Sequence, residues 1–394
     1  MDHGIEKANK TNYLLLFSRL FVGILFIFSG LIKANDPIGF SYKLQEYFEV
    51  FHLPFLNNYA VGVAVILCSL EVVLGVLLLL GLYGRKVAAG LLLLILFFTF
   101  LTFYSAFFNV VTSCGCFGDA IPLTPWQSFS KDIVLFIFIA IIYFFRKDIH
   151  PLFSNEISQS LALAAAIVFS IGMGIYTYQF SPFIDFLPYK EGNNLPALMH
   201  VPNGAPLDEY EITYTLQNKK TTETKSLTDK EYLAKEIWKD EDWEIVGDPK
   251  SRLIKEGYKA PIKDLSITDA QGVDHTKEII ENPYYNLLFV AYDLSKSNIR
   301  ALEKLNQYAK AAAEEFNIRV VLLTASSAQN VAALNDELTL YPETFFADAV
   351  PLKSMVRANP GILLLKNGTV IKKWHYHTIP SFETLATEYF EQVD

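Results

Sequence analysis

Residues 13–32 have the sequence YLLLFSRLFVGILFIFSGLI, which is apolar except for Ser18, Arg19 and Ser29. About 20 mainly apolar residues are needed to cross the hydrocarbon core of a bilayer. Further apolar runs of spanning length occupy residues 59–82, 87–111, 129–145 and 161–180. The sequence therefore predicts an α-helical membrane bundle with five spans. The first run is too long for a signal peptide's apolar region and precedes no small-x-small cleavage site, so we interpret it as a retained helix.

Charge divides the chain into two halves. Residues 1–182 carry 10 basic and 10 acidic side chains, whereas residues 183–394 carry 23 and 32 and account for the whole net charge of −9. A neutral, apolar half followed by an acidic, polar half indicates a membrane domain joined to a soluble one. The acidic soluble half argues against nucleic-acid binding, which depends on a basic surface.

The loop charges predict the orientation, because Lys and Arg accumulate in cytoplasmic loops. Basic residues precede the first run and follow the second and fourth, while the loop 112–128 has none. This pattern puts the amino terminus inside and residues 183–394 outside, which in a bacterium means an inner-membrane protein, surrounded by membrane lipid, with a periplasmic domain. Lys33 and Lys43, assigned to the first outer loop, fit this pattern less well. The inner basic residues are Lys7, Lys10, Arg85, Lys86, Arg146 and Lys147.

Inside the predicted spans we single out Arg19, Cys68 and Glu71. A charge at membrane depth is costly unless it is paired, so we expect Arg19 and Glu71 to face the bundle interior and pair with each other. In the alternative interpretation they line a site for a quinone head group or a proton path. Cys68 shares a helix face with Glu71, and a lone cysteine there is typical of a small buried hydrophobe.

A short cysteine motif, SCGCFGD at residues 113–119, lies in the outer loop after the third run. Cys114 and Cys116 are one residue apart beside glycines that permit a tight backbone, so their Cα atoms can fall within the ~7 Å that a disulfide requires. Strained, exposed disulfides are the labile and catalytic ones, which makes this pair the candidate catalytic site. A structural disulfide remains an alternative. A metal site would need Asp119 and His52 as further ligands, and we assign none.

Residues 13–146 resemble the DoxX and MauE families of four-helix membrane proteins. The resemblance rests on residues 19–23, 28–33, Glu71 with Gly75 and Gly81, and most specifically on CGCFG at 114–118. Proteins similar to MauE serve the maturation of a disulfide-rich periplasmic enzyme, and those similar to DoxX are linked to thiol and sulfur oxidoreduction at the quinone level. The resemblance thus implies a redox function in the periplasm, with a quinone as the candidate cofactor.

The soluble half divides at about residue 255. Residues 183–255 predict a small α/β subdomain, with strands at 210–216 and 221–227 and a helix start at Thr228. The remainder predicts strands at 286–292, 318–324 and 344–347, helices at 295–316, 328–338 and 381–392, and a hairpin at 361–375 that turns at Asn367 and Gly368. We therefore divide the chain into 1–150 (membrane domain), 151–182 (fifth span), 183–255 and 256–394.

The β-α-β-α-β-β-α order of residues 256–394 resembles the peroxiredoxin and TlpA-like branch of the thioredoxin fold. Residues 256–261, 287–291, 357–361 and 363–368 carry the resemblance, with Asn359 and Pro360 in the place of the family's cis-proline loop. The family's Cys-x-x-Cys is replaced by YDLSKSN at 292–298. Because thiol exchange needs a thiolate, the resemblance implies a soluble α/β domain that docks a client without catalysing exchange.

Two functions remain open at this point. In the first, Cys114 and Cys116 exchange electrons with a quinone, a periplasmic thiol protein or both, and the degenerate thioredoxin-like domain docks the client. In the second, the chain is a non-enzymatic, membrane-anchored scaffold or binding subunit of an envelope complex, and its cysteines are structural. The two functions differ in whether Cys114 and Cys116 alternate between the dithiol and the disulfide.

Overall fold

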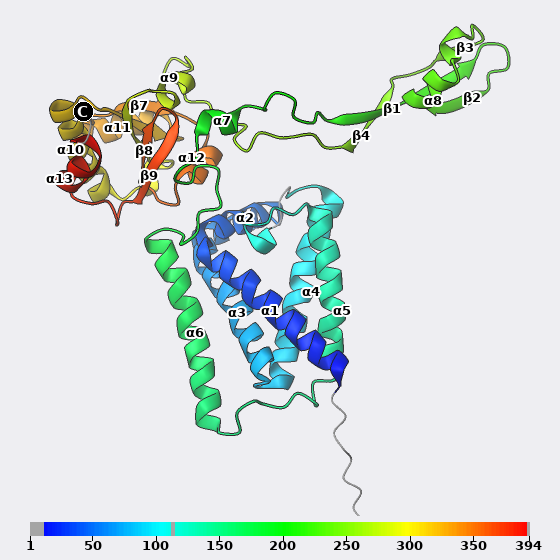
Figure 1. Cartoon of the computed structure of the whole chain (residues 1–394), viewed down its shortest axis with the longest axis horizontal. Helices are drawn as coiled ribbons and strands as arrows, with labels where there is room; N and C mark the ends of the chain where they lie inside the picture. Colours follow the sequence, from blue (N-terminus) through cyan, green and yellow to red (C-terminus); the bar gives the residue numbers. More distant parts are fainter. Residues whose placement is uncertain (1–11, 112–114, 392–394) are drawn as a thin grey trace, which may run out of the picture. The chain divides into compact units, whose positions relative to one another are not determined.

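The computed structural model describes residues 12–111 and 115–391, without the side chain of Cys116. Five helices of the described part are long and apolar enough to cross a membrane, which confirms the predicted spans (Figure 1). Polar caps start several of them, as when Asn12 accepts a hydrogen bond from the Leu15 amide. The helices are α1 (Tyr13–Asn35), α3 (Ala60–Leu80), α4 (Gly84–Phe108), α5 (Pro125–Phe144) and α6 (Glu156–Gln179).

Helices α1 and α3 pack closely through glycines. A Cβ atom on Gly75 would lie 2.8 Å from the carbonyl oxygen of Gly23, and one on Gly30 would lie 2.8 Å from that of Cys68. Small residues let helix backbones approach in a membrane, where packing rather than the hydrophobic effect drives association. This close contact fixes the rotation of α3 about its axis, and with it the direction in which Glu71 points.

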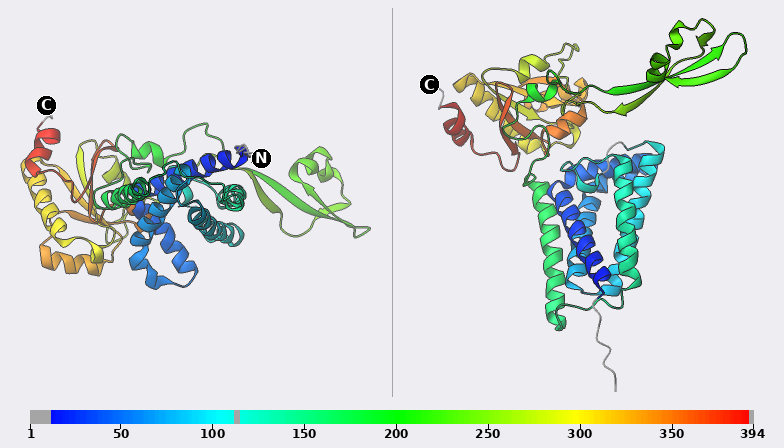
Figure 2. Two further views of the ribbon diagram at one scale, coloured as in Figure 1. Left: turned by 90° about the horizontal axis from the view of Figure 1, so that it is seen from below. Right: turned by 45° about the vertical axis from the view of Figure 1, so that its right-hand side comes forward.

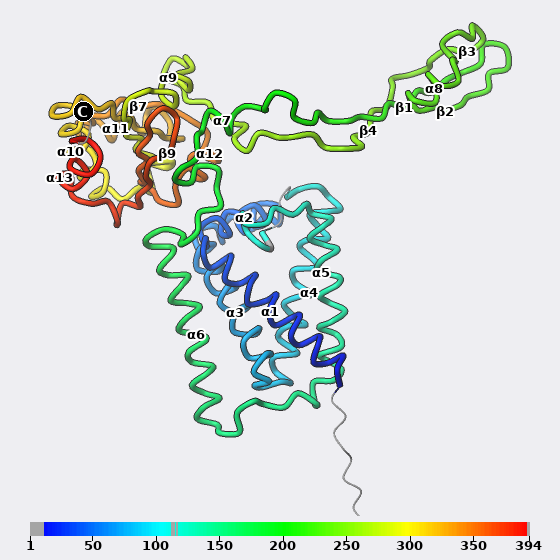
Figure 3. The backbone as a smooth tube through the Cα atoms, in the orientation of Figure 1, coloured from blue at the N-terminus to red at the C-terminus, as the bar shows by residue number. Residues whose placement is uncertain are grey.

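Helix α2 (Pro37–Val50) lies across the end of the bundle, in a segment that the sequence analysis assigned to a loop (Figure 3). Asp36 ends α1 and caps α2, because its side chain accepts a hydrogen bond from the Gly39 amide at 2.8 Å. The helix buries Phe40, Leu44 and Tyr47 on the bundle. A short 3-10 turn, η1 (Pro54–Tyr59), then leads into α3.

The last span, α6, packs against α3 and α1 along the side of the bundle (Figure 2). Its buried residues are small or weakly polar: Ala166, Ser170, Gly174 and Thr177. The Thr177 hydroxyl donates a hydrogen bond to the Ala34 carbonyl oxygen at 2.6 Å. The chain leaves α6 at the end of the bundle where α2 lies (Figure 1).

Residues 266–391 contain a five-stranded sheet of order β7-β6-β5-β8-β9. The central β5 pairs parallel with β6 and antiparallel with β8. The predicted hairpin is present, and Asn367 and Gly368 both have positive φ, as an Asn-Gly turn requires. The strands are β5 (Tyr285–Val290), β6 (Arg319–Thr324), β7 (Glu343–Phe346), β8 (Gly361–Lys366) and β9 (Thr369–His375).

Helices cover this sheet. The boundaries of two of these helices differ from those expected from the sequence. The first long helix begins at Ile299, not at 295, because Asn298 caps it after a 3-10 turn, Leu294–Lys296. The closing helix is a short α turn that continues as a π turn, Ala386–Phe390. The helices are α9 (Thr276–Ile280), α10 (Ile299–Phe316), α11 (Ala328–Leu338), α12 (Ala349–Met355) and α13 (Phe382–Leu385).

Residues Asn193–Leu265 form a compact unit of their own. Its strand β1 pairs antiparallel with each of the other three strands. Thr228 and Glu231 form the capping box that the sequence predicts. The elements are α7 (Leu195–Met199), β1 (Glu209–Asn218), β2 (Thr224–Thr228), α8 (Asp229–Ala234), β3 (Trp243–Ile245) and β4 (Lys250–Lys255).

The close contact of α1 and α3 predicts that Gly75→Val destabilises the bundle by about 1–3 kcal/mol, because overpacking forces the backbones apart. Gly62→Val is the matched control on the same helix, since no atom lies within 4 Å of a Cβ placed there. Thermal unfolding of the detergent-purified protein measures both. Equal melting temperatures for the two variants would show that the glycine contact does not hold the bundle together.

Candidate functional site

The cysteine loop is the segment 112–119 between α4 and α5. Cys114 lies outside the described residues, as does the side chain of Cys116, so their pairing stays a prediction. Residues Gly115–Phe117 form a 3-10 turn, η2. The positions of Gly115 and Phe117 therefore define where the backbone around Cys116 lies.

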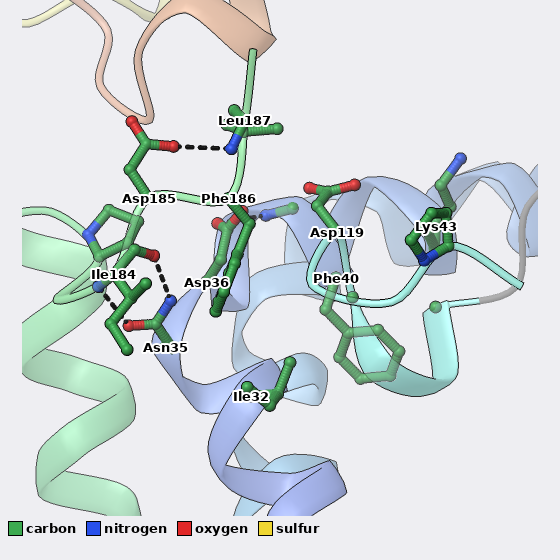
Figure 4. Close-up of a pocket in the computed structure, with 15 residues that line it drawn as sticks. Ile32, Asn35, Asp36, Phe40, Lys43, Asp119, Ile184, Asp185, Phe186 and Leu187 are labelled. Atoms are coloured by element: carbon green, nitrogen blue, oxygen red, sulfur yellow. Dashed lines mark hydrogen bonds between the residues drawn. The ribbon is translucent and has the colours of Figure 1, made fainter. Parts of the chain in front are cut away.

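Gly115, Gly118 and Asp119 line a pocket at the end of the bundle, which we call the outer pocket (Figure 4). Its other walls are the junction of α1 with α2 and the segment 182–187 after α6. Two hydrogen bonds from Asn35 hold this segment in place. The Asn35 side chain donates to the Ile184 carbonyl oxygen at 2.8 Å and accepts from the Ile184 amide at 3.1 Å. The cysteine loop thus borders a cavity that the ends of three spans enclose.

A second cavity, the inner pocket, lies among α1, α3, α4 and α5 and contains ionic groups. The Lys33 ammonium lies 2.6 and 2.7 Å from the two Glu71 carboxylate oxygens, and the two side chains are 3% and 2% exposed. Across the pocket, Asp132 bonds to Lys131 and accepts a hydrogen bond from the Thr102 hydroxyl at 2.9 Å. The lining includes Lys33, Glu71, Lys131, Asp132 and the rings of Phe98 and Phe117.

The η2 turn lies between these two pockets. Gly115 lines the outer pocket and Phe117 lines the inner one. The Lys131 ammonium lies 5.4 Å from the centre of the Phe117 ring, and the Lys33 ammonium lies 5.2 Å from that of Phe98. The backbone of Cys116 is therefore placed between an outer cavity and a buried polar cluster.

The predicted Arg19–Glu71 pair is wrong. Arg19 donates to the carbonyl oxygens of Leu78 and Leu79 at the end of α3, at 3.1 and 3.3 Å. Helical side chains lean toward the N-terminus of their helix, and α1 and α3 are antiparallel, so Arg19 and Glu71 diverge. Lys33 near the C-terminus of α1 and Glu71 lean toward each other. Lys33, which the sequence analysis placed in a loop, is the true partner, and this leaning rule could have identified it.

Cys68 is fully buried on α3 and packs with Ala34, Phe40 and Leu44. It is a free thiol in an apolar environment. This is the packing role that the sequence analysis favoured for it.

Asn359 forms hydrogen bonds to the segment 292–298, which replaces the family's Cys-x-x-Cys. The Asn359–Pro360 peptide bond is cis. The Asn359 amide group donates to the Asp293 carbonyl oxygen at 2.7 Å and accepts from the Ser297 hydroxyl at 3.0 Å. Its backbone oxygen also accepts from the Asn298 amide at 3.3 Å. The polar groups of Asn359 are thus satisfied within the domain.

Arg357, two residues before Asn359, begins the run 357–361 that carries the thioredoxin-like resemblance, but the sequence analysis gave it no role of its own. Its guanidinium donates to Asp36 at 2.7 Å and to Asp119 at 3.0 Å. Burial alone would lower the pKa of Arg357, but the two carboxylates outweigh it and raise the pKa, so the side chain stays charged. Nothing in the local sequence marks this arginine, because its partners lie 321 and 238 residues away.

Comparison with known proteins finds a family similar to the membrane half. Residues 11–145, which include α1 to α5, match the family model of the methylamine utilisation protein MauE. Together with the sheet order of residues 266–391, this match shows that the chain joins a MauE-like membrane domain to a thioredoxin-like domain, as predicted.

Two individual proteins are also similar. The protein TlpB of Flavobacterium psychrophilum is 32% identical over 146 residues, which are 36% of this chain and 39% of that protein. The chain therefore spans about two fifths of the length of this curated relative. A solution structure assigned as a protein disulfide isomerase of Bacteroides thetaiotaomicron covers 33% of this chain and 87% of its own, with 11% identity and a TM-score of 0.28.

The ion pair predicts that Glu71→Gln destabilises the protein by about 3–5 kcal/mol, because it leaves the Lys33 ammonium buried without a counter-charge. The double variant Lys33→Met with Glu71→Leu should cost less than Glu71→Gln alone. Arg19→Met is the control, and its effect should add to that of Glu71→Gln. Melting temperatures in detergent measure these three variants, the single variant Lys33→Met and the double variant Arg19→Met with Glu71→Gln. Effects of Lys33 and Glu71 that simply add would contradict the pair.

Proposed function

We propose that this chain is a thiol–disulfide module of the bacterial inner membrane, in which Cys114 and Cys116 pass electrons from a periplasmic thiol protein to a membrane quinone. One observation carries the proposal: the η2 turn, which includes Cys116, lies between the outer pocket and the buried polar cluster. A carrier between an aqueous thiol and an acceptor dissolved in lipid needs this position. The MauE-like membrane domain supports the same reading.

The proposed exchange proceeds in two substitutions at sulfur. A client thiolate attacks the Cys114–Cys116 disulfide and releases one cysteine as a thiolate, with the client bound as a mixed disulfide. A second client thiolate attacks this bond, so the client leaves as a disulfide and the pair becomes a dithiol. Two electrons and two protons then pass to the quinone, which becomes a quinol while the pair returns to a disulfide.

The ionic groups around the inner pocket suit the proton transfers of the quinone half of this cycle, but the cavity itself, about 30 Å³, is too small to enclose a quinone ring. Reduction of a quinone to a quinol consumes two protons. Ionic side chains at membrane depth are energetically costly, so those found there are expected to have a function. The pairs Lys33–Glu71 and Lys131–Asp132 bring proton donors and acceptors there, beside the aromatic rings of Phe98 and Phe117. The Lys33 ammonium already donates to Ser29 and to both Glu71 oxygens, so Lys131 is the lysine that would donate a hydrogen bond to a quinone oxygen.

The proposal requires the thioredoxin-like domain and the cysteine loop to be periplasmic. The basic pairs Arg85–Lys86 and Arg146–Lys147 follow the C-terminal ends of α3 and α5, which supports a cytoplasmic location for that end of the bundle. A reporter enzyme that is active only outside the cytoplasm should therefore work when fused after Asp394. The same reporter fused after Lys147 should be inactive, and activity of this second fusion alone would reverse the orientation.

Thiol trapping in cells tests the chemistry. Cys116→Ser should trap a mixed disulfide between Cys114 and an oxidised client, because exchange passes through this intermediate in both directions: the Cys114 thiolate attacks the client disulfide, and Cys116 is no longer present to displace the client. Cys114→Ser should trap differently or not at all, since one sulfur attacks and the other resolves. Cys68→Ser is the control and should behave as the wild type, because Cys68 is buried away from solvent. The readout is adduct formation on non-reducing gels.

A scaffold is the second candidate function, and one observation favours it. The thioredoxin-like domain has no cysteine, and its cis-proline loop satisfies its own polar groups through Asn359. If the two cysteines are structural, both single variants should behave alike and form no adduct. That result would assign the chain to a non-enzymatic subunit of an envelope complex.

A further inference from the structure

We propose that a chain of three small, water-filled pockets passes protons between the outer face of the bundle, where α2 lies, and the buried ion pairs, and that protons reach these pairs from that face alone. The inference rests on the proposed function and adds the side of the membrane that supplies its protons. The chain consists of the outer pocket, a middle pocket and the inner pocket. The middle pocket lies between α1, α2 and α4, and its lining includes Lys33, Phe40, Lys43, Tyr47, Phe98 and Thr102.

The three pockets share walls, so they form one route. Phe40, Lys43 and Gly115 line both the outer pocket and the middle one (Figure 4). Lys33 and Phe98 line both the middle pocket and the inner one. Lys33 therefore belongs at once to the wall of the middle pocket and to the ion pair at the end of the route.

The size and the lining of these pockets suit water. Their volumes are about 60, 20 and 30 Å³ from the outer pocket to the inner one. A space of about 10–15 Å³ holds one water molecule, provided that two to four polar groups surround it. The middle and inner pockets each offer such groups but have no room for an organic ligand. Water is therefore the occupant that both pockets fit.

Hydroxyl groups and ion pairs border the route from its middle to its inner end. The Thr102 hydroxyl lines the middle pocket and donates a hydrogen bond to Asp132, which lines the inner pocket, at 2.9 Å. The Tyr47 hydroxyl, also on the middle pocket, lies 2.8 Å from that of Ser105. A hydroxyl group both donates and accepts, as water does, so a proton can be handed along such a series. The series leads to the carboxylates of Asp132 and Glu71.

The opposite half of the bundle is packed with apolar side chains. Water finds no hydrogen-bond partner on such side chains, so it does not enter between them. The Arg19 guanidinium in this half is turned to the end of α3, where it donates to the Leu78 and Leu79 carbonyl oxygens. The fully buried apolar side chains of this half are Leu78, Leu82, Leu91, Ile139 and Ile142.

Access from one face determines whether the proposed reaction moves charge across the membrane. Oxidation of a client dithiol releases two protons at the outer face, and reduction of the quinone takes up two protons. If the route supplies these two protons, they come from the same face as the two electrons. The transfer is then electroneutral, because equal numbers of protons and electrons enter the membrane from one side.

Water radiolysis tests for the route in the resting protein, without thiol or quinone. A brief X-ray pulse turns bound water into hydroxyl radicals, which modify the side chains beside it, and mass spectrometry measures the modification. In lipid nanodiscs, Phe26 on the inner pocket and Tyr47 on the middle pocket should be modified at least about tenfold faster than the controls. The controls are Phe21 and Phe138, which pack on each other in the apolar half, with their ring centres 5.0 Å apart.

A blocking variant tests whether the inner pocket communicates with the outer face. Leu101 lines the middle pocket, so Leu101→Phe should fill it and slow the exchange of inner water at least about tenfold. The measurement is brief mixing with water that carries a heavy oxygen isotope, followed by the pulse and detection of that isotope on Phe26. Leu91→Phe is the matched control on the same helix, since it has the same cost of overpacking but lies in the apolar half.

Proteoliposomes test the side from which the protons come. A dithiol peptide that cannot cross the bilayer is added outside, so it engages the molecules whose α2 end faces outward. A quinone is dissolved in the bilayer, and a pH-sensitive dye is trapped inside. The internal pH should stay constant while quinol forms, because both protons come from outside. Internal alkalinisation in step with quinol formation would overturn access from one face.

Equal modification of Phe26 and Phe21, or equal isotope exchange in the Leu101 and Leu91 variants, would overturn the route itself. Radiolysis reports water in the pockets whether or not the protein turns over. A modified Phe26 with no quinol formation would therefore reject the proposed redox function and keep the water-filled route. Quinol formation with an unmodified Phe26 would reject the route and keep the redox function.

Discussion

A lysine ammonium and a glutamate carboxylate meet inside the membrane bundle, and the arrangement of α1 and α3 depends on that contact. Lys33 and Glu71 come from antiparallel helices whose backbones approach through glycines. The ion pair is satisfied only at one rotation and one vertical register of the two helices. That register places the α1–α2 junction, with Asp36, beside the cysteine loop. The buried charge thus specifies geometry at the surface of the membrane as well as in its interior.

The architecture could largely be predicted from the sequence, because it depends on features that are local in the chain. Apolar runs defined the five spans, and the Asn367-Gly368 turn and the Thr228 capping box lie where their residue types require. Helix α2 was missed because its 14 residues mix apolar and polar side chains and so form no apolar run of spanning length. The helix start after β5 was placed at 295, but Asn298 supplies the cap and the helix begins at Ile299.

The ionic contacts were harder to predict, because they join residues that are distant in the chain. Lys33 was assigned to a loop by its place at the end of an apolar run, although its side chain leans back into the bundle. Arg357 lies in a loop of the soluble half and bonds to Asp36 and Asp119 in the membrane half. No periodicity or motif links such residues. The cysteine pair, by contrast, is evident from spacing alone, and the structure adds the surroundings of its turn.

The last span has a consequence for how such a chain could arise by gene fusion. The region that matches MauE contains four spans, an even number, so its two ends lie on the same side of the membrane. A domain fused directly to that region would stay in the compartment where the chain begins. Helix α6 changes the parity, and its buried stripe of small residues packs closely against α3 and α1. One added helix is thus the least that allows a four-span module to display a folded domain on the opposite side.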